Sequence, residues 1–106
     1  IKSVAIMSND VTAYPEDSFD NMKTFAKKNN FSFPYLFDED QTVAKNYGAV
    51  CTPDFFGYNE DLELQYRGRI FAARPTELST AMQQISKTGN GPKNQFPSMG
   101  CSIKWK

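Results

Sequence analysis

Apolar positions along the chain form short runs and helical repeats that predict alternating strands and helices. Residues 4–7 are a continuous apolar run, which predicts a strand buried on both faces. Residues 15–17, a proline and two acidic residues, are typical of the first turn of a helix. Lys27 and Lys28 are typical of its last turn. The apolar residues between them recur at helical spacing: Phe19, Met22, Phe25 and Ala26. A strand followed by an amphipathic helix is half of a βαβ unit.

The rest of the chain continues the alternation. Aromatic residues alternate over residues 31–37 around a proline, so we expect a short strand or an edge segment. A short helix ends at Gly48, and residues 55–58 and 62–66 predict a hairpin. The last helix opens at residues 74–76. Its apolar face is predicted to hold Leu78, Ala81, Met82 and Ile85. The expected order is β-α-(β)-α-β-β-α.

After residue 87 the composition changes to that of a loop rich in glycine and proline. The end of the chain carries apolar residues that need somewhere to pack. We therefore expect a domain over residues 1–87, and a loop and tail over residues 88–106 that pack back on it.

The composition excludes several classes of function. The chain has 106 residues, enough for one domain, and twelve basic residues balance twelve acidic ones, so we expect no nucleic-acid partner. It contains no histidine, which removes Ser-His and Cys-His pairs and histidine metal sites. We expect no metal and no cofactor. We also expect no membrane partner, because no apolar run approaches the roughly 20 residues that span a bilayer. Two cysteines are too few for a disulfide scaffold. The sequence does not specify the cellular compartment of the protein, and we slightly favour the cytoplasm.

The segment from residue 47 to residue 56 carries the main chemical signal. A glycine that can end a helix is followed by Cys51, Thr52 and Pro53 and then by an aromatic strand. A proline that opens a strand beside a thiol is the arrangement of a thiol-disulfide site, although the chain has no C-x-x-C motif. An ordinary trans proline at the start of an edge strand is the alternative.

Several blocks of sequence, in the same order, resemble one family. They are VAIMSND (4–10), YPED (14–17), FPYLFD (33–38), VAKNYG (43–48), CTPDFF (51–56), YRG (66–68) and GCSIKWK (100–106). These blocks are similar to the peroxiredoxin-like branch of the thioredoxin superfamily, the alkyl hydroperoxide reductase/thiol-specific antioxidant group. The resemblance implies a thioredoxin-like α/β fold of three layers, α/β/α, with a mixed sheet. The chain departs from the family at residues 71–73, where acidic residues are usual.

By this resemblance, the fold is truncated at its N-terminal strand and dithiol helix. The first residue already belongs to a strand pattern, so we expect a longer natural protein. The reactive cysteine of the family precedes the strand that matches residues 4–7, and the missing strand lies between that strand and the one at residues 55–58. Unpaired sheet edges would make the isolated chain poorly stable and prone to form homo-oligomers. Without the reactive cysteine, we also expect the isolated chain to be inactive.

The resemblance also suggests site residues. It implies a cis bond before Pro53, which would present the Thr52 backbone to an extended substrate or a disulfide partner. Cys51 is either a resolving thiol or a buried small apolar residue. A Cys51–Cys101 disulfide would need the tail to fold back, and the alternative is an unpaired thiol at Cys101.

Other polar residues have both a functional and a structural interpretation. Ser8, Asn9 and Asp10 follow a strand at the sheet edge where α/β proteins place their sites, so they either line a redox cleft or only end the strand. The arginines at positions 67, 69 and 74 are better explained as solvated than as thiolate-stabilising. The acidic residues 38–40 are better explained as a charge patch at a helix N-terminus.

These residues and the resemblance leave three alternative hypotheses for the function. The first is an antioxidant thiol-disulfide or peroxide oxidoreductase, with a thiol reductant or a protein disulfide as partner. Its reactive cysteine would lie outside this chain. The second is a non-catalytic thioredoxin-like module that binds peptides at Pro53 or through exposed aromatic residues. The third makes Cys51 itself a lone redox-active thiol.

Overall fold

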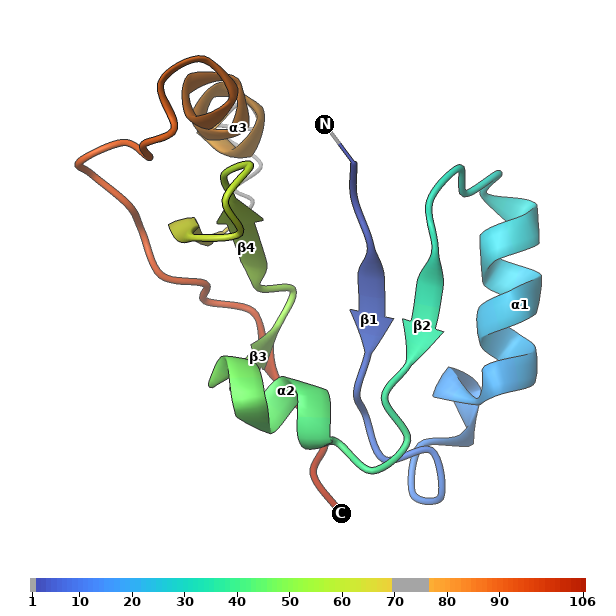
Figure 1. The fold of residues 1–106 in the computed structure, drawn as a ribbon. Coiled ribbons are helices and arrows are strands. Elements are labelled where there is room, and N and C mark those ends of the chain that lie inside the picture. The colour runs from blue at the N-terminus through green and yellow to red at the C-terminus, as the bar shows by residue number, and fades with distance from the viewer. Residues whose placement is uncertain (1, 70–76) are drawn as a thin grey trace. The chain divides into compact units, whose positions relative to one another are not determined.

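The computed structural model describes residues 2–69 and 77–106 (Figure 1). These residues form two compact units. The N-terminal unit contains residues 2–50 together with 103–106, and the C-terminal unit contains residues 51–102. The predicted domain over residues 1–87, with a loop and tail over residues 88–106, stays a prediction. The predicted start of the last helix at residues 74–76, the departure at residues 71–73 and Arg74 all lie outside the described residues.

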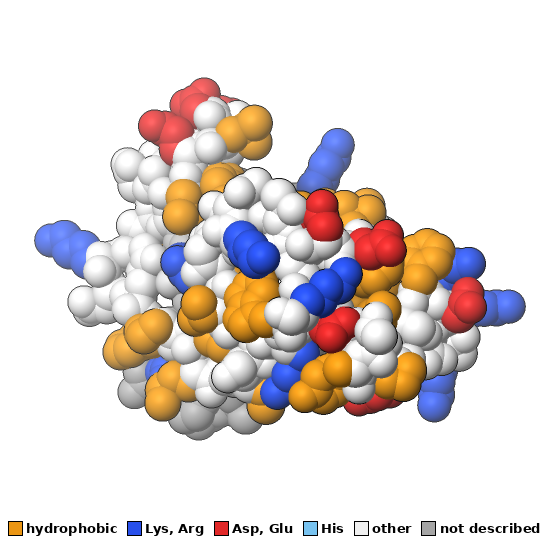
Figure 2. Space-filling model, turned by 90° about the horizontal axis from the view of Figure 1, so that it is seen from below, with side chains coloured by type: hydrophobic (Ala, Val, Ile, Leu, Met, Phe, Trp, Pro, Cys, Tyr) orange, Lys and Arg blue, Asp and Glu red, His pale blue; other side chains and the backbone are white. Residues whose placement is uncertain are grey.

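The face of the molecule shown in Figure 2 agrees with the balanced charge of the sequence. Basic and acidic side chains are interspersed on the face shown in Figure 2, and hydrophobic side chains lie among them. None of the helices in the described part of the chain is long and apolar enough to cross a membrane.

The N-terminal unit is built on a βαβ element. Strand β1 (Ala5–Met7) leads through the 3₁₀ turn η1 (Pro15–Asp17) and helix α1 (Phe19–Lys28) to strand β2 (Tyr35–Phe37). The two strands are parallel and pair in register from Ala5↔Tyr35 to Met7↔Phe37, as Figure 1 shows. Helix α2 (Thr42–Tyr47) follows and ends at a left-handed Gly48. The predicted order of elements is confirmed here.

Helix α1 is favoured by a capping residue at its start, basic residues at its end and a buried apolar residue on its inner face. The Ser18 hydroxyl accepts a hydrogen bond from the Asn21 N–H at 3.3 Å and caps the first turn. Lys27 and Lys28 occupy the last turn, where positive charge complements the helix dipole. Met22 is buried on the inner face.

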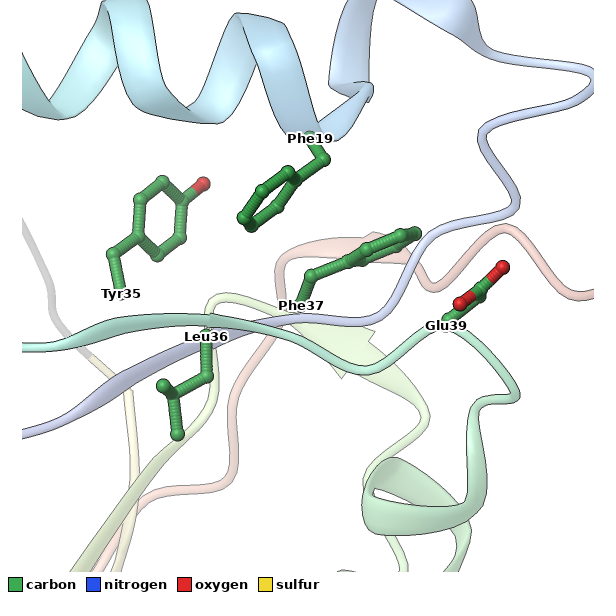
Figure 3. Close-up of a pocket in the computed structure, with 5 residues that line it drawn as sticks. All are labelled: Phe19, Tyr35, Leu36, Phe37 and Glu39. Carbon is green, nitrogen blue, oxygen red and sulfur yellow. The ribbon is translucent and has the colours of Figure 1, made fainter.

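The β1–β2 sheet is covered on one face only. The Phe37 ring lies 6.2 Å from that of Phe19 on α1, and Tyr35 projects to the same side of the strand (Figure 3). On the other face Leu36 and Ile6 are 51% and 41% exposed. The prediction of a strand buried on both faces is therefore wrong for this structure, because no described element of the unit covers that second face.

The described residues of the C-terminal unit form two antiparallel pairs of strands and one helix. Strand β3 (Cys51–Thr52) pairs with β6 (Cys101–Ser102), and β4 (Phe55–Tyr58) pairs with β5 (Leu64–Gly68). The hairpin begins its second strand at Leu64 and not at residue 62. Leu62 lies in the turn with a φ of +59°.

Helix α3 (Glu77–Thr88) packs on this hairpin. Its Ala81 and Ile85 form a core with Tyr66 of β5, and three partly buried residues pack around that core: Phe55, Leu78 and Met82. The predicted apolar face of the last helix is confirmed.

The strands of residues 2–69 and 77–106 form three separate two-stranded sheets. Within the described residues, β1 pairs only with β2, and β4 only with β5. Each of these strands therefore keeps one edge that no other described strand occupies. The tail packs back in two places, since residues 101–102 pair with β3 and residues 103–106 belong to the N-terminal unit.

Candidate functional site

The turn between β3 and β4 has the geometry that the sequence suggested. The Thr52–Pro53 peptide bond is cis, and it joins the end of β3 to Asp54 and the start of β4. We call Cys51, Thr52, Pro53 and Asp54 the cis-proline turn.

The tail covers one side of this turn. The Ser98 hydroxyl donates a hydrogen bond to the Pro53 carbonyl. Cys101 lies opposite Thr52 in the β3–β6 pair. A Cβ atom at Gly100 would overlap the Thr52 carbonyl oxygen and lie 3.1 Å from the Pro53 nitrogen, so the carbonyl of Thr52 faces the tail. The Thr52 backbone is thus paired with the protein's own tail.

Cys51 is partly buried, and its thiol donates a hydrogen bond to the Ser98 carbonyl at 3.5 Å. Cys101 is exposed, and both cysteines are free. The suggested Cys51–Cys101 disulfide is therefore not formed. The tail does fold back, but Cys51 is in register with Ser102 and Thr52 with Cys101. Neighbouring residues of a strand point to opposite faces, so the two thiols lie on opposite faces of the ladder.

Asp54 and Arg67 form an ion pair that the sequence analysis missed. The Arg67 Nε and Nη2 donate to Asp54 Oδ2 at 3.3 and 3.1 Å, and the guanidinium lies over the Phe56 ring at 4.9 Å. The Asp54 side chain is 5% exposed, whereas that of Arg67 is 42% exposed. The signal available in the sequence was an acidic residue directly after Thr-Pro, together with an arginine on the partner strand of the hairpin.

A second ion pair lies beside the core of the C-terminal unit. Arg69 pairs with Glu77 at 3.3 Å and lies over the Phe96 ring at 4.6 Å. The expectation that Arg69 is solvated is wrong, because this side chain is mostly buried between Glu77 and Phe96. The Tyr66 hydroxyl donates to the Arg69 carbonyl at 3.2 Å. Burial of Tyr66, and next the Glu77 carboxylate, raise the pKa of its phenol above the ordinary value.

Ser8, Asn9 and Asp10 belong to the other compact unit, so their surroundings are described separately. They follow β1 and hold the tail. The Asn9 Oδ1 accepts the Lys104 N–H at 2.9 Å, and the Asp10 N–H donates to the Lys104 carbonyl at 2.7 Å. The Ser8 hydroxyl donates to Asp38 Oδ2 at 2.8 Å. These contacts favour the structural interpretation of the three residues.

Asp38 is buried and acts as a cap for α2. Its carboxylate accepts the N–H groups of Val43 and Ala44 at 3.1 and 2.9 Å, in addition to the Ser8 hydroxyl. The Asp40 carboxylate accepts hydrogen bonds from Thr42, which lower the Asp40 pKa from its usual value. The prediction of acidic residues at a helix N-terminus is correct for both, although Asp38 is buried and not part of a surface patch.

Gln41 was missed by the sequence analysis. It is 2% exposed, with a φ of +64°. Its Nε2 donates to the carbonyls of Ser8 and Lys104, both at 2.8 Å, and its Oε1 accepts the Lys106 N–H at 3.1 Å. A lone glutamine in a polar stretch carries no sequence signal for such a role.

The N-terminal unit also carries a pocket with a volume of about 580 Å³ (Figure 3). It is lined by Phe19, Tyr35, Leu36, Phe37 and Glu39. Figure 3 shows Leu36 pointing to the opposite side of the strand from Tyr35 and Phe37, so the lining spans both sides of β2. In the described part of the chain, no three His, Cys, Asp or Glu side chains could together hold a metal ion.

Comparison with known proteins identifies what the chain is similar to. The AhpC/TSA family model matches residues 3–73. A hypothetical protein from Sinorhizobium meliloti 1021 is 41% identical over 99% of the chain, with a TM-score of 0.93. An uncharacterized conserved protein from Geobacillus kaustophilus is 46% identical over 99%, with a TM-score of 0.91. The chain spans 62% and 60% of the lengths of these two proteins. No curated protein matches it.

Proposed function

Because the chain belongs to the AhpC/TSA family, we propose that it is part of a thiol-dependent oxidoreductase that acts on a disulfide or a peroxide. The reactive cysteine of this enzyme lies in a segment outside residues 1–106. The cis-proline turn forms the side of the active site that faces this cysteine. The observation that carries the proposal is the cis bond before Pro53, placed beside Cys51 in a chain with a thioredoxin-like fold.

Two further observations support a reactive segment outside the chain. The two similar solved proteins are longer, since the chain spans 62% and 60% of them. Strands β1 and β4 each keep one edge that no described strand occupies. A strand edge exposes backbone N–H and C=O groups that favour pairing with another strand. A preceding strand that carries the reactive cysteine at its end would supply such a partner.

The chemistry is thiol exchange. With a disulfide, the reactive thiolate forms a bond to one sulfur while the substrate S–S bond breaks, and the other sulfur leaves as a thiolate. With a peroxide, the O–O bond breaks, the cysteine becomes a sulfenic acid and the other oxygen leaves as water or an alcohol. In both cases a thiol reductant then supplies two electrons and restores the free thiol.

Neither cysteine of this chain is needed for that chemistry. Cys51 is hydrogen-bonded and partly buried, and Cys101 lies on the opposite face of the ladder. The test uses the full-length protein and measures reduction of hydrogen peroxide and of a disulfide substrate, with dithiothreitol as reductant. We expect the Cys51→Ser/Cys101→Ser double variant to keep activity within about threefold of the unaltered protein.

The control is a full-length variant in which every cysteine upstream of this chain is replaced by serine. We expect it to lose both activities. Activity that depends on Cys51 would instead favour a lone redox-active thiol in this chain. A full-length protein that reduces neither substrate but binds an extended peptide would favour a non-catalytic binding module.

A further inference from the structure

The loop that follows α3 contains the one Asn-Gly pair of the sequence, Asn90 and Gly91. Asn90 lies two residues beyond Thr88, the last residue of α3, and it is exposed. The hydrogen bond from its Nδ2 to the Thr88 carbonyl is long, at 3.4 Å. Neither residue of the pair belongs to the cis-proline turn, so this loop is a separate feature of the C-terminal unit.

Position 91 has room only for glycine. A Cβ atom there would overlap the Gln65 carbonyl oxygen and lie 3.3 Å from the Gln95 Nε2. The Gly91 N–H donates to Gln65 Oε1 at 3.2 Å, and the Gln95 Nε2 donates to the Gln65 carbonyl at 2.9 Å. These contacts attach the loop to β5, and they require a close approach of two backbone segments. The fold therefore keeps a glycine directly after an exposed asparagine.

An asparagine that precedes glycine can lose its amide group without an enzyme. The backbone nitrogen of the glycine attacks the side-chain Cγ of the asparagine. A C–N bond forms while the bond from Cγ to the amide nitrogen breaks, and the proton of the attacking nitrogen leaves with the ammonia. Water then opens the resulting succinimide ring at either carbonyl and gives aspartate or isoaspartate. Glycine favours this attack because it has no side chain to block the nitrogen, and asparagine is a thermolabile residue for this reason.

We propose that Asn90 is a site of spontaneous deamidation, and that Gln65 controls the rate by holding the attacking nitrogen. Attack requires the peptide plane of Gly91 to turn until its nitrogen faces the Cγ of Asn90. The hydrogen bond from the Gly91 N–H to Gln65 Oε1 fixes that plane. Gln65 is thus a positioning residue that slows the reaction. Neither step requires the thiol chemistry proposed above.

Deamidation alters the end of α3 and the attachment of the loop. A carboxylate at position 90 places negative charge near a helix C-terminus, where the helix dipole is also negative. A carboxylate also has no N–H to donate to the Thr88 carbonyl. Isoaspartate adds a methylene group to the main chain before Gly91, which displaces the Gly91 N–H from Gln65. We therefore expect the modified loop to lose its attachment to β5.

The test follows deamidation at each asparagine of the full-length protein in mildly alkaline buffer, by peptide mass spectrometry at increasing times. Asn94 is the matched control, because it is exposed in the same loop but precedes Gln95, whose side chain hinders the attack. We expect Asn90 to deamidate first, while Asn94 keeps its amide. Gln65→Ala should accelerate the reaction at Asn90 by about two- to tenfold, which corresponds to the net contribution of one hydrogen bond. Gln65→Glu keeps an acceptor oxygen and should react at the rate of the unaltered protein.

The proposed site is overturned if Asn90 keeps its amide, or if Asn94 reacts as fast. The role of Gln65 is overturned if Gln65→Ala reacts at the unaltered rate while circular dichroism shows that it is folded. If Gln65→Ala does not fold, a synthetic peptide of residues 84–96 replaces it. This peptide lacks Gln65, so Asn90 should deamidate faster in it than in the folded protein, and equal rates would refute the control by Gln65.

Discussion

Replacing Gln41 with alanine should loosen the attachment of the tail to the N-terminal unit. The side chain is 2% exposed and makes three hydrogen bonds, to Ser8, Lys104 and Lys106. Alanine removes all three and leaves two carbonyls and one N–H to find other partners. A net hydrogen bond contributes about 0.5–1.5 kcal/mol. Three such bonds give a loss of about 3 kcal/mol in the free energy of unfolding, which is a large part of the roughly 5–15 kcal/mol that stabilises a domain.

The chain provides a matched control in Gln95. Its Nε2 donates to the carbonyls of Gln65 and Pro92 at 2.9 and 3.0 Å, and its Oε1 accepts the Arg67 N–H at 2.9 Å. Gln95 therefore makes the same number of bonds as Gln41, but it is exposed. Water can take over those bonds after truncation. Gln95→Ala should cost about 1 kcal/mol or less.

The assay is urea unfolding followed by circular dichroism, combined with hydrogen exchange of the backbone amides of Lys104 and Lys106. We expect Gln41→Ala to destabilise the protein by about 2 kcal/mol more than Gln95→Ala does, and to accelerate exchange at both amides. Equal destabilisation by the two variants, with unchanged exchange in the tail, would refute the assignment of Gln41 as the anchor of the tail.

Three other predictions concern the C-terminal unit. Gly100→Ala should destabilise the protein by about 1–3 kcal/mol, because its methyl group overlaps the Thr52 carbonyl oxygen; urea unfolding that matches the unaltered protein would contradict this. Burial raises the pKa of Tyr66, so the neutral phenol is favoured in the folded state. This contribution to stability is complete below pH 10 and is lost as the pH rises through the folded-state pKa; absorbance at 295 nm should show late-titrating tyrosine signal from Tyr66 and from Tyr35, whose pKa is raised too, and Tyr66→Phe should remove only the Tyr66 part. Cys101 should react with iodoacetamide faster than Cys51 because it is exposed, whereas Cys51 is partly buried and hydrogen-bonded; mass spectrometry after brief labelling would contradict this if Cys51 were modified first.

Local patterns in the sequence predicted the elements well. The helical spacing around Ile85 produced α3 with the expected inner face. In α1 Met22 is buried as expected, but Phe19 and Phe25 are 48% and 53% exposed. The hairpin was predicted from alternation alone, but its second strand begins two residues late because Leu62 adopts a positive φ in the turn. Alternation does not specify where a turn ends, since that depends on backbone angles that several residue types can adopt.

These local patterns did not predict contacts between residues far apart in the chain. Asp54 and Arg67 are 13 positions apart, and Gln41 and Lys104 are 63 positions apart. Whether a polar side chain is buried with a partner depends on how distant segments meet, and no local spacing records that. The relation of Cys51 to Cys101 depends on strand register, where a shift of one residue moves a side chain to the other face.

The central claim is that this chain supplies the cis-proline wall for a reactive cysteine outside residues 1–106. The most direct test is to treat the full-length protein with a disulfide substrate, quench the reaction in acid, and locate the mixed disulfide by peptide mass spectrometry. We expect the trapped substrate to be attached to a cysteine outside this chain. A mixed disulfide on Cys51 or Cys101, with the other cysteines free, would contradict it.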